Sequence, residues 1–197
     1  RFRSSTNQNP FQQTPGKEGK CGTIRLTLKI IADAGFIGLP NAGKSSLLNA
    51  LTRAKAKVGS YPFTTLEPNL ADFYGHILAD IPGLIEGASS GRGLGIKFLK
   101  HVERTGILLH LVSANQDDPV AAYREVSGEI ESFGHGLAAK REIIILSKID
   151  LISLEECETK MRLLAKETGR EVLSVSVEDP VALKKFADKL AQMLSRQ

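Results

Sequence analysis

The sequence predicts an α/β fold, a mostly parallel sheet with helices on both of its faces. Short apolar runs, some of them rich in β-branched residues, alternate along the chain with amphipathic stretches of helical period. Because parallel strands need crossover connections, this alternation favours strands joined by helices. A glycine-rich loop at residues 38–45 joins an apolar run to an amphipathic one, which is typical of P-loop NTPases.

Each element has a local signal of its own. The expected strands are the apolar runs at residues 26–31 continuing into 34–39, 69–74, 76–79, 106–112, 143–146 and 172–175. The expected helices follow Lys44, Gly93, Asp118, Ser153 and Pro180. Asp118 with Pro119 forms an N-cap followed by a first-turn proline, and Ser153 with Glu156 forms a capping box.

The glycine-rich loop has the pattern G-x-x-x-x-G-K-S, formed by Gly38, Leu39, Pro40, Asn41, Ala42, Gly43, Lys44 and Ser45. Gly38 and Gly43 permit backbone conformations that a Cβ would forbid, so amide N–H groups can turn inward around an anion. The anion then lies at the positive end of the following helix. We expect Lys44 to bind the terminal phosphates and Ser45 to ligate Mg²⁺. The alternative is an ordinary glycine-rich turn before a helix.

Two further signals follow in the order expected of a guanine-nucleotide switch. Asp80, Ile81, Pro82 and Gly83 come after an apolar segment. Asp80 can hold Mg²⁺ through water at a strand end, and the Gly83 N–H can reach a γ-phosphate. Upstream lie Phe63, Thr64, Thr65, Leu66 and Glu67, of which Thr65 is expected to ligate Mg²⁺ only when the γ-phosphate is present. The alternatives are an ordinary turn and two threonines that start a strand.

A third signal concerns the base. Ser147, Lys148, Ile149 and Asp150 follow a β-branched run that is typical of a buried parallel strand. A carboxylate there can accept hydrogen bonds from both N–H groups of the guanine edge, which adenine does not offer, so Asp150 is the expected base selector. The alkyl stem of Lys148 is expected to cover a face of the base. The alternative is a helix cap, because Asp150 precedes two apolar residues. The three signals together predict GTP or GDP with Mg²⁺.

Length and composition favour one soluble domain. The chain has 197 residues, 42% of them hydrophobic, which suffices for one substantial core. Cys21 and Cys157 show no metal-ligand spacing, and neither a transmembrane run nor a signal peptide is present, so we expect a cytoplasmic protein without a membrane span. The net charge of +4 indicates a mild preference for anionic partners. A monomer that does not bind DNA is the default expectation.

Longer stretches closely resemble one family. The runs GLPNAGKSSLLNAL, YPFTTLEPNL, DIPGLIEGAS followed by GRGLG, and FLKHVERT are similar to those of the Obg (CgtA) GTPases. The resemblance covers essentially the whole chain and implies the end of a glycine-rich Obg domain at residues 1–31 and an OBG-type GTPase domain at residues 32–197, so the chain is expected to be a fragment. It also implies a role in large ribosomal subunit assembly and the stress response, and binding of the alarmone ppGpp.

The resemblance places the last base-binding pair at Ser176 and Val177, whose backbone N–H groups are expected to bind the guanine oxygen. Ser147 stands where the family has Asn or Thr. Its shorter side chain can still tether loops but loses reach, so weaker guanine affinity is expected. Val177 replaces an alanine and can crowd the base. The segment after Leu70 is also shorter than in the family, which predicts a trimmed hairpin before Asp80.

Leu84 stands where many small GTPases carry a glutamine that orients the attacking water. Leucine forms no side-chain hydrogen bond, so we expect slow hydrolysis in which Lys44, Thr65, Gly83 and Asn41 act on the phosphates. In related GTPases with this substitution, the residue at the position of Asn41 helps to bind K⁺, which predicts potassium stimulation.

Other interpretations stay open at this point. Arg92 is expected to be an exposed switch residue rather than an arginine finger. A binding module that senses GDP, GTP or ppGpp with negligible hydrolysis is the alternative function. A P-loop ATPase or kinase with relaxed base choice is a third, because of Ser147.

Overall fold

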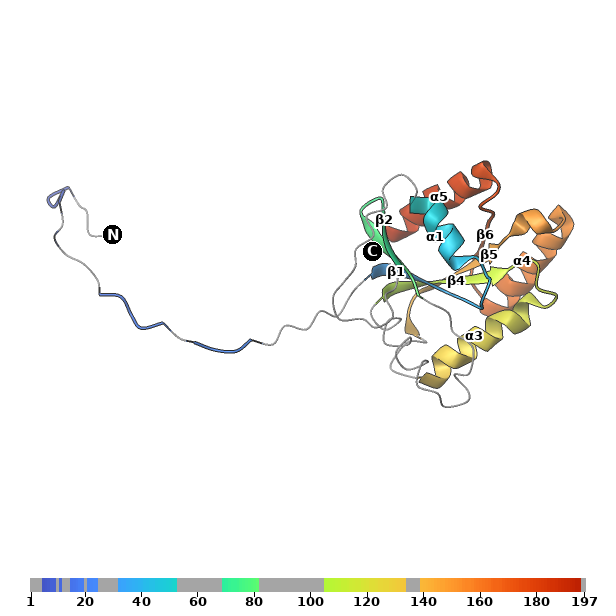
Figure 1. Cartoon of the computed structure of the whole chain (residues 1–197), viewed down its shortest axis with the longest axis horizontal. Coiled ribbons are helices and arrows are strands. Elements are labelled where there is room, and N and C mark those ends of the chain that lie inside the picture. The colour runs from blue at the N-terminus through green and yellow to red at the C-terminus, as the bar shows by residue number, and fades with distance from the viewer. Residues whose placement is uncertain are drawn as a thin grey trace.

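The computed structural model describes residues 5–9, 11, 15–19, 21–24, 32–52, 69–81, 105–133 and 139–195. Within these residues, six strands form one sheet in the order β2-β3-β1-β4-β5-β6 (Figure 1). The strands are β1 (Ala32–Ile37), β2 (Asn69–Phe73), β3 (His76–Asp80), β4 (Thr105–Ser113), β5 (Glu142–Ser147) and β6 (Val172–Val175). Of these described strands, β2 alone is antiparallel to its neighbour. The predicted mostly parallel sheet is therefore confirmed.

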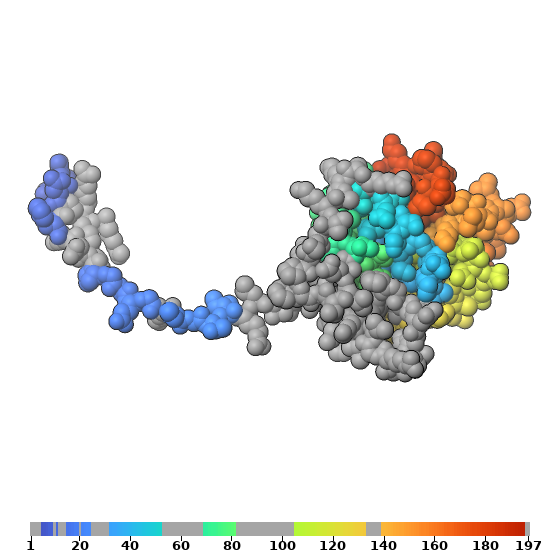
Figure 2. Space-filling view, viewed as in Figure 1, coloured from blue at the N-terminus to red at the C-terminus, as the bar shows by residue number. Residues whose placement is uncertain are grey.

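Helices cover both faces of the sheet, as predicted. They are α1 (Lys44–Thr52), α3 (Pro119–Phe133), α4 (Leu154–Thr168) and α5 (Pro180–Leu194). Leu47 of α1 and Phe186 of α5 belong to the core on one face, whereas Val126 of α3 and Leu164 of α4 belong to cores on the other. Figure 2 shows the surfaces of α1 and α5 side by side. No helix in the described part of the chain is both long and apolar enough to cross a membrane.

The hairpin of β2 and β3 has a two-residue turn. Tyr74 and Gly75 both lie in the left-handed region, with φ of 51° and 86°. Turns with positive φ at both central residues match the twist of the strands that they join. A tight hairpin therefore precedes Asp80, the last residue of β3, and that it is shorter than in the family stays a prediction.

The central strands are buried on both faces. Ile144 and Ile145 of β5 point to opposite faces, and neither has any exposed surface. This double burial explains the continuous apolar run in the sequence. The buried imidazole of His110 on β4 places Nδ1 2.8 Å from Oε1 of Glu142 on β5, which indicates a structural role for this histidine.

Capping residues begin the three longest described helices. Oδ1 of Asp118 accepts hydrogen bonds from two backbone N–H groups of α3 at 2.9 Å each. Ser153 and Glu156 form the capping box of α4. Both predicted caps are confirmed, whereas the equivalent cap of α5 by Asp179 was not predicted. The strand expected at 26–31 and the helix expected after Gly93 lie outside the described residues.

Candidate nucleotide-binding site

The predicted motifs meet at the carboxyl edge of the sheet. The phosphate loop follows β1, Asp80 is the last residue of β3, and Ser147 is the last residue of β5. Phe36 of β1 pairs with Asp80. Ser147 pairs with Val175 of β6. Because ligands of open α/β sheets bind outside the carboxyl ends of the strands, these motifs are placed to share one site.

The phosphate loop has a backbone geometry that restricts its residues. Gly38 and Gly43 have φ of 143° and 92°, and Asn41 lies in the left-handed region at 60°. A Cβ on Gly38 would lie 2.3 Å from the carbonyl oxygen of Leu111, far inside contact distance. The requirement for glycine at both positions, predicted from the sequence, is confirmed.

Lys44 lies folded against this loop. Its Nζ donates hydrogen bonds to the carbonyl oxygens of Gly38 at 3.0 Å and Leu39 at 2.9 Å, and the residue is only 8% exposed. Burial lowers the pKa of Lys44, and the negative charge of Asp80 opposes this effect. The ammonium group therefore has little water around it, so an arriving phosphate would be attracted with little screening.

Ser45 and Asp80 form the second polar pair of the site. The Ser45 hydroxyl donates a hydrogen bond to Oδ2 of Asp80. Oδ1 of Asp80 is buried and has no hydrogen-bond partner within the described part of the chain. A buried carboxylate oxygen without a partner is costly, and hydroxyl and carboxylate oxygens are ligands that Mg²⁺ prefers. The residues present therefore fit the predicted Mg²⁺.

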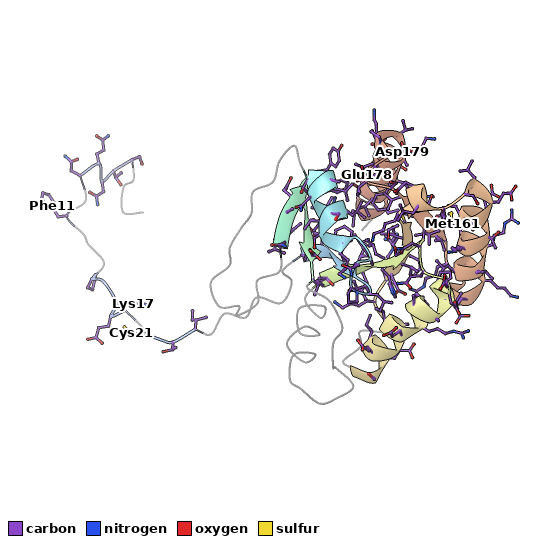
Figure 3. The ribbon with its side chains drawn as sticks, turned by 45° about the vertical axis from the view of Figure 1, so that its right-hand side comes forward. Phe11, Lys17, Cys21, Met161, Glu178 and Asp179 are labelled. Carbon is purple, nitrogen blue, oxygen red and sulfur yellow. The ribbon has the colours of Figure 1, made fainter. Side chains whose placement is uncertain are left out.

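A cavity of about 260 Å³ lies beside the phosphate loop. Gly43 and Leu47 line it from the loop and α1, whereas Asp150 and Val177 line it from the segments after β5 and β6. Figure 3 shows Glu178, another lining residue, at the start of α5. Apolar walls with a few convergent charged groups are typical of small-molecule sites.

Asp150 is held in place by a neighbouring hydroxyl. It lies in a short 3₁₀ helix, η3 (Ile149–Leu151). Ser176 Oγ donates a hydrogen bond to Oδ1 of Asp150 and accepts one from the backbone N–H of Glu178 at 3.0 Å. The N-cap of α4 is Ser153, and Asp150 lies inside η3, so the alternative interpretation of Asp150 as a helix cap is wrong.

Ser147 joins the base-side motif to the phosphate loop. Its Oγ donates a hydrogen bond to the carbonyl oxygen of Ala42 at 2.7 Å, and the carbonyl oxygen of Val112 lies at 3.3 Å. The next residue, Lys148, is in the left-handed region, and a Cβ on Gly43 would lie 3.8 Å from its Cε. The predicted tether through a shorter hydroxyl is therefore confirmed, and the Lys148 stem runs past the phosphate loop.

The structure brings together the described members of the predicted site, namely residues 38–45, 80–81, 147–150 and 176–177. The others lie outside the described residues: Phe63, Thr64, Thr65, Leu66, Glu67, Pro82 and Gly83, with Leu84 and Arg92. The prediction missed five residues that line the cavity, namely Ser46, Leu47, Leu151, Val175 and Glu178. Each lies next to a predicted motif residue or one position beyond it, and only this closeness in the sequence could have identified it as a cavity residue.

Known proteins share this sequence pattern and fold. The family described as 50S ribosome-binding GTPase matches residues 33–148, more than half of the chain. The solved complex of SsGBP with GDP aligns with a TM-score of 0.65 at 18% identity and covers 84% of this chain and 50% of that one. Era in complex with MgGDPNP and part of 16S ribosomal RNA gives 0.57 at 21% identity, with coverages of 86% and 57%.

A third structure, the FeoB G-domain from Methanococcus jannaschii, gives a TM-score of 0.54 at 17% identity and covers 83% of this chain and 97% of that one. Identities this low show the fold alone. The chain spans 50% and 57% of the lengths of the SsGBP and Era chains. The family match, in contrast, includes the phosphate loop, Asp80 and the start of the base motif. The chain therefore belongs to the family of 50S ribosome-binding GTPases.

Proposed function

We propose that this chain is an Obg-like GTPase that binds GTP or GDP with Mg²⁺ and hydrolyses GTP slowly. The proposal rests mainly on one observation: the phosphate loop also forms part of the wall of the cavity that contains Asp150. Gly43 lines the cavity beside Asp150, and the next residue, Lys44, is bonded to the phosphate loop. A nucleotide with its phosphates in the loop then places its base beside Asp150. The YPFTTL and IPGLIEGA runs support the Obg-like assignment.

At the phosphate end, Lys44 and the loop N–H groups hold the β- and γ-phosphates. The Lys44 ammonium exchanges neutral carbonyl acceptors for charged phosphate oxygens, which form stronger hydrogen bonds. Ser45 and Asp80 would hold Mg²⁺, which supplies positive charge to the phosphate oxygens as negative charge develops on them. In the proposed switch, Thr65 and Gly83 are the residues that respond to the presence of the γ-phosphate.

At the base end, Asp150 accepts hydrogen bonds from N1–H and the 2-amino group of guanine. Adenine presents an acceptor at N1, so its edge faces the carboxylate without a donor at that position. Ser176 orients this carboxylate, and the backbone N–H groups of Ser176 and Val177 bind the guanine oxygen. The Lys148 stem covers one face of the base.

Titration of GDP and ADP into the chain, with Mg²⁺ present, tests the proposal. We expect GDP to bind about a hundredfold more tightly, because two hydrogen bonds to a charged acceptor are at stake. Equal affinities would indicate a P-loop ATPase or kinase instead.

Slow hydrolysis follows from Leu84, and potassium stimulation follows from Asn41. Asn41 is exposed in the phosphate loop with a left-handed backbone, which leaves its side chain accessible beside the phosphates. A monovalent cation there would supply positive charge to the transition state. GTP hydrolysis rates measured in potassium chloride and in sodium chloride test the potassium stimulation, and equal rates in the two salts would contradict it.

The proposal extends to a cytoplasmic monomer that acts in large ribosomal subunit assembly and stress, with ppGpp as a competing nucleotide. Residues 1–31 would be the end of an Obg domain and residues 32–197 the GTPase domain. The family description supports a ribosomal partner. Leu84 favours one alternative, a nucleotide sensor with negligible hydrolysis. Single-turnover hydrolysis with and without large ribosomal subunits separates the two, since a sensor shows no measurable cleavage in either case.

A further inference from the structure

Ser147 lines the base cavity, but its hydroxyl hydrogen is already engaged elsewhere. A serine hydroxyl has one hydrogen to donate. Here it goes to the carbonyl oxygen of Ala42 at 2.7 Å, and the next acceptor, the carbonyl oxygen of Val112, lies at 3.3 Å. Ser147 is 4% exposed, so no bulk water competes for this bond. The hydroxyl therefore presents only lone pairs to the cavity.

The remaining polar side chains of the described cavity wall are either hydrogen-bond acceptors or donors that lie on the phosphate-loop side. Asp150 and Glu178 are carboxylates, which only accept hydrogen bonds when ionised. The Cε of Lys148 lies by Gly43, and its ammonium is one bond further on, so this donor is held at the phosphate-loop side. Ser46 lies in the first turn of α1, the end of the helix that faces the phosphates. Apart from Ser147, the side-chain donors of the described wall are therefore Ser46 and Lys148, and both lie on the phosphate-loop side of the cavity.

Guanine has donors at N1 and the 2-amino group and acceptors at O6 and N7. We propose that this site reads only the edge with N1, N2 and O6, and that Ser147 is a positioning residue that ties the phosphate loop to β5 without binding N7. This inference rests on the proposed function. It adds a substrate class: guanine nucleotides in which N7 is replaced by C–H should bind as well as GDP.

The direct test compares GDP, 7-deaza-GDP and ADP in calorimetric titrations of the chain with Mg²⁺. We expect the two guanine nucleotides to bind within about twofold of each other, because no hydrogen bond differs between them. A preference for GDP over 7-deaza-GDP of about fivefold or more would overturn the inference but leave the proposed function intact. A chain that binds GDP no better than ADP removes the proposed function, and the inference with it.

Variants at position 147 separate positioning from base reading. An asparagine amide has two N–H donors, one for the carbonyl of Ala42 and one for N7, so Ser147→Asn should prefer GDP over 7-deaza-GDP by about 3- to 10-fold. Ser147→Ala loses only the tether and should weaken both nucleotides by the same factor. A Ser147→Ala variant that weakens GDP more than 7-deaza-GDP would show that the Ser147 hydroxyl binds N7 and would overturn the assignment.

Ser46→Ala covers the competing donor. If the unmodified chain prefers GDP over 7-deaza-GDP and Ser46→Ala loses this preference, the Ser46 hydroxyl binds N7 and the inference is wrong. If the ratio stays near one in both proteins, the inference holds.

Discussion

At the scale of single residues, the site is prepared by two buried groups of opposite charge. Burial lowers the pKa of the Lys44 ammonium, and its hydrogen bonds go to neutral carbonyls. Oδ1 of Asp80 is buried without a partner among the described residues. Both groups are costly in the free protein, and a phosphate with its metal would satisfy both. Preorganised charge of this kind favours binding because little reorganisation is needed when the ligand arrives.

We expect the free protein to gain stability relative to its Lys44→Met variant as the pH rises. The pKa of Lys44 is lower in the folded state than in the unfolded chain, so the unfolded state binds more protons between the two values. The cost of the buried charge therefore falls as the pH rises from the folded pKa toward the pKa of the unfolded chain. Urea unfolding of both proteins at pH 7 and pH 10, without nucleotide, measures this. Free energies of unfolding that keep a constant difference would contradict it.

Replacing Ser176 with alanine should reduce GDP affinity about fivefold and reduce the preference over ADP, because the Asp150 carboxylate loses the bond that orients it. Ser174→Ala, two residues earlier on β6, is the matched control. Titration of both variants with GDP and ADP provides the comparison. The same loss in the two variants would mean that the Ser176 hydroxyl has no particular role in base selection.

At the scale of elements, the phosphate loop takes its shape from the neighbouring strand. Its first glycine, Gly38, packs against the backbone of Leu111 in β4, so the turn can follow β1 only without a side chain. Gly128 in α3 is a contrasting case, since a Cβ there would meet no described atom within 4 Å. The turn therefore requires glycine at position 38, as the loop motif predicted, whereas the surroundings of Gly128 do not require one.

Alanine substitutions at these two glycines should act in opposite directions. Gly128→Ala should raise the free energy of unfolding by about 0.5 to 1 kcal/mol, because alanine favours an open helical position. Gly38→Ala should lower it by about 2 kcal/mol or more and abolish GDP binding, because the Cβ meets a backbone oxygen. Urea unfolding and GDP titration measure both effects. A Gly38→Ala protein that binds GDP normally would contradict the description of the loop.

At the scale of the whole molecule, features encoded by adjacent residues were predictable, and features made by distant residues were not. The strand at 172–175 and the cap at Ser153 follow from local pattern. β5 extends one residue beyond its predicted bounds at each end, because Glu142 and Ser147 are paired with β4. The bond between Ser147 and Ala42 spans 105 positions, so no local pattern signals it, and the tether by Ser147 was expected only from the resemblance to a known family.

The same division applies within the site. The phosphate loop, Asp80 and Asp150 carry recognisable motifs, because the chemistry of phosphate, metal and guanine restricts residue type at fixed spacing. Leu151 and Glu178 line the cavity only because the segments after β5 and β6 lie beside α1. Their contribution depends on tertiary arrangement, and many residue types would fit there.

The central claim is that the Lys44 loop and the Asp150 cavity hold opposite ends of one guanine nucleotide. Titrations of GDP and xanthosine diphosphate into the chain and into Asp150→Asn, with Mg²⁺, test it most directly. We expect the variant to lose GDP affinity and to gain affinity for xanthosine diphosphate, each by about tenfold or more, because an amide can donate to the oxygen that xanthine carries in place of the amino group. A variant that keeps its GDP affinity and gains none for xanthosine diphosphate would contradict the account.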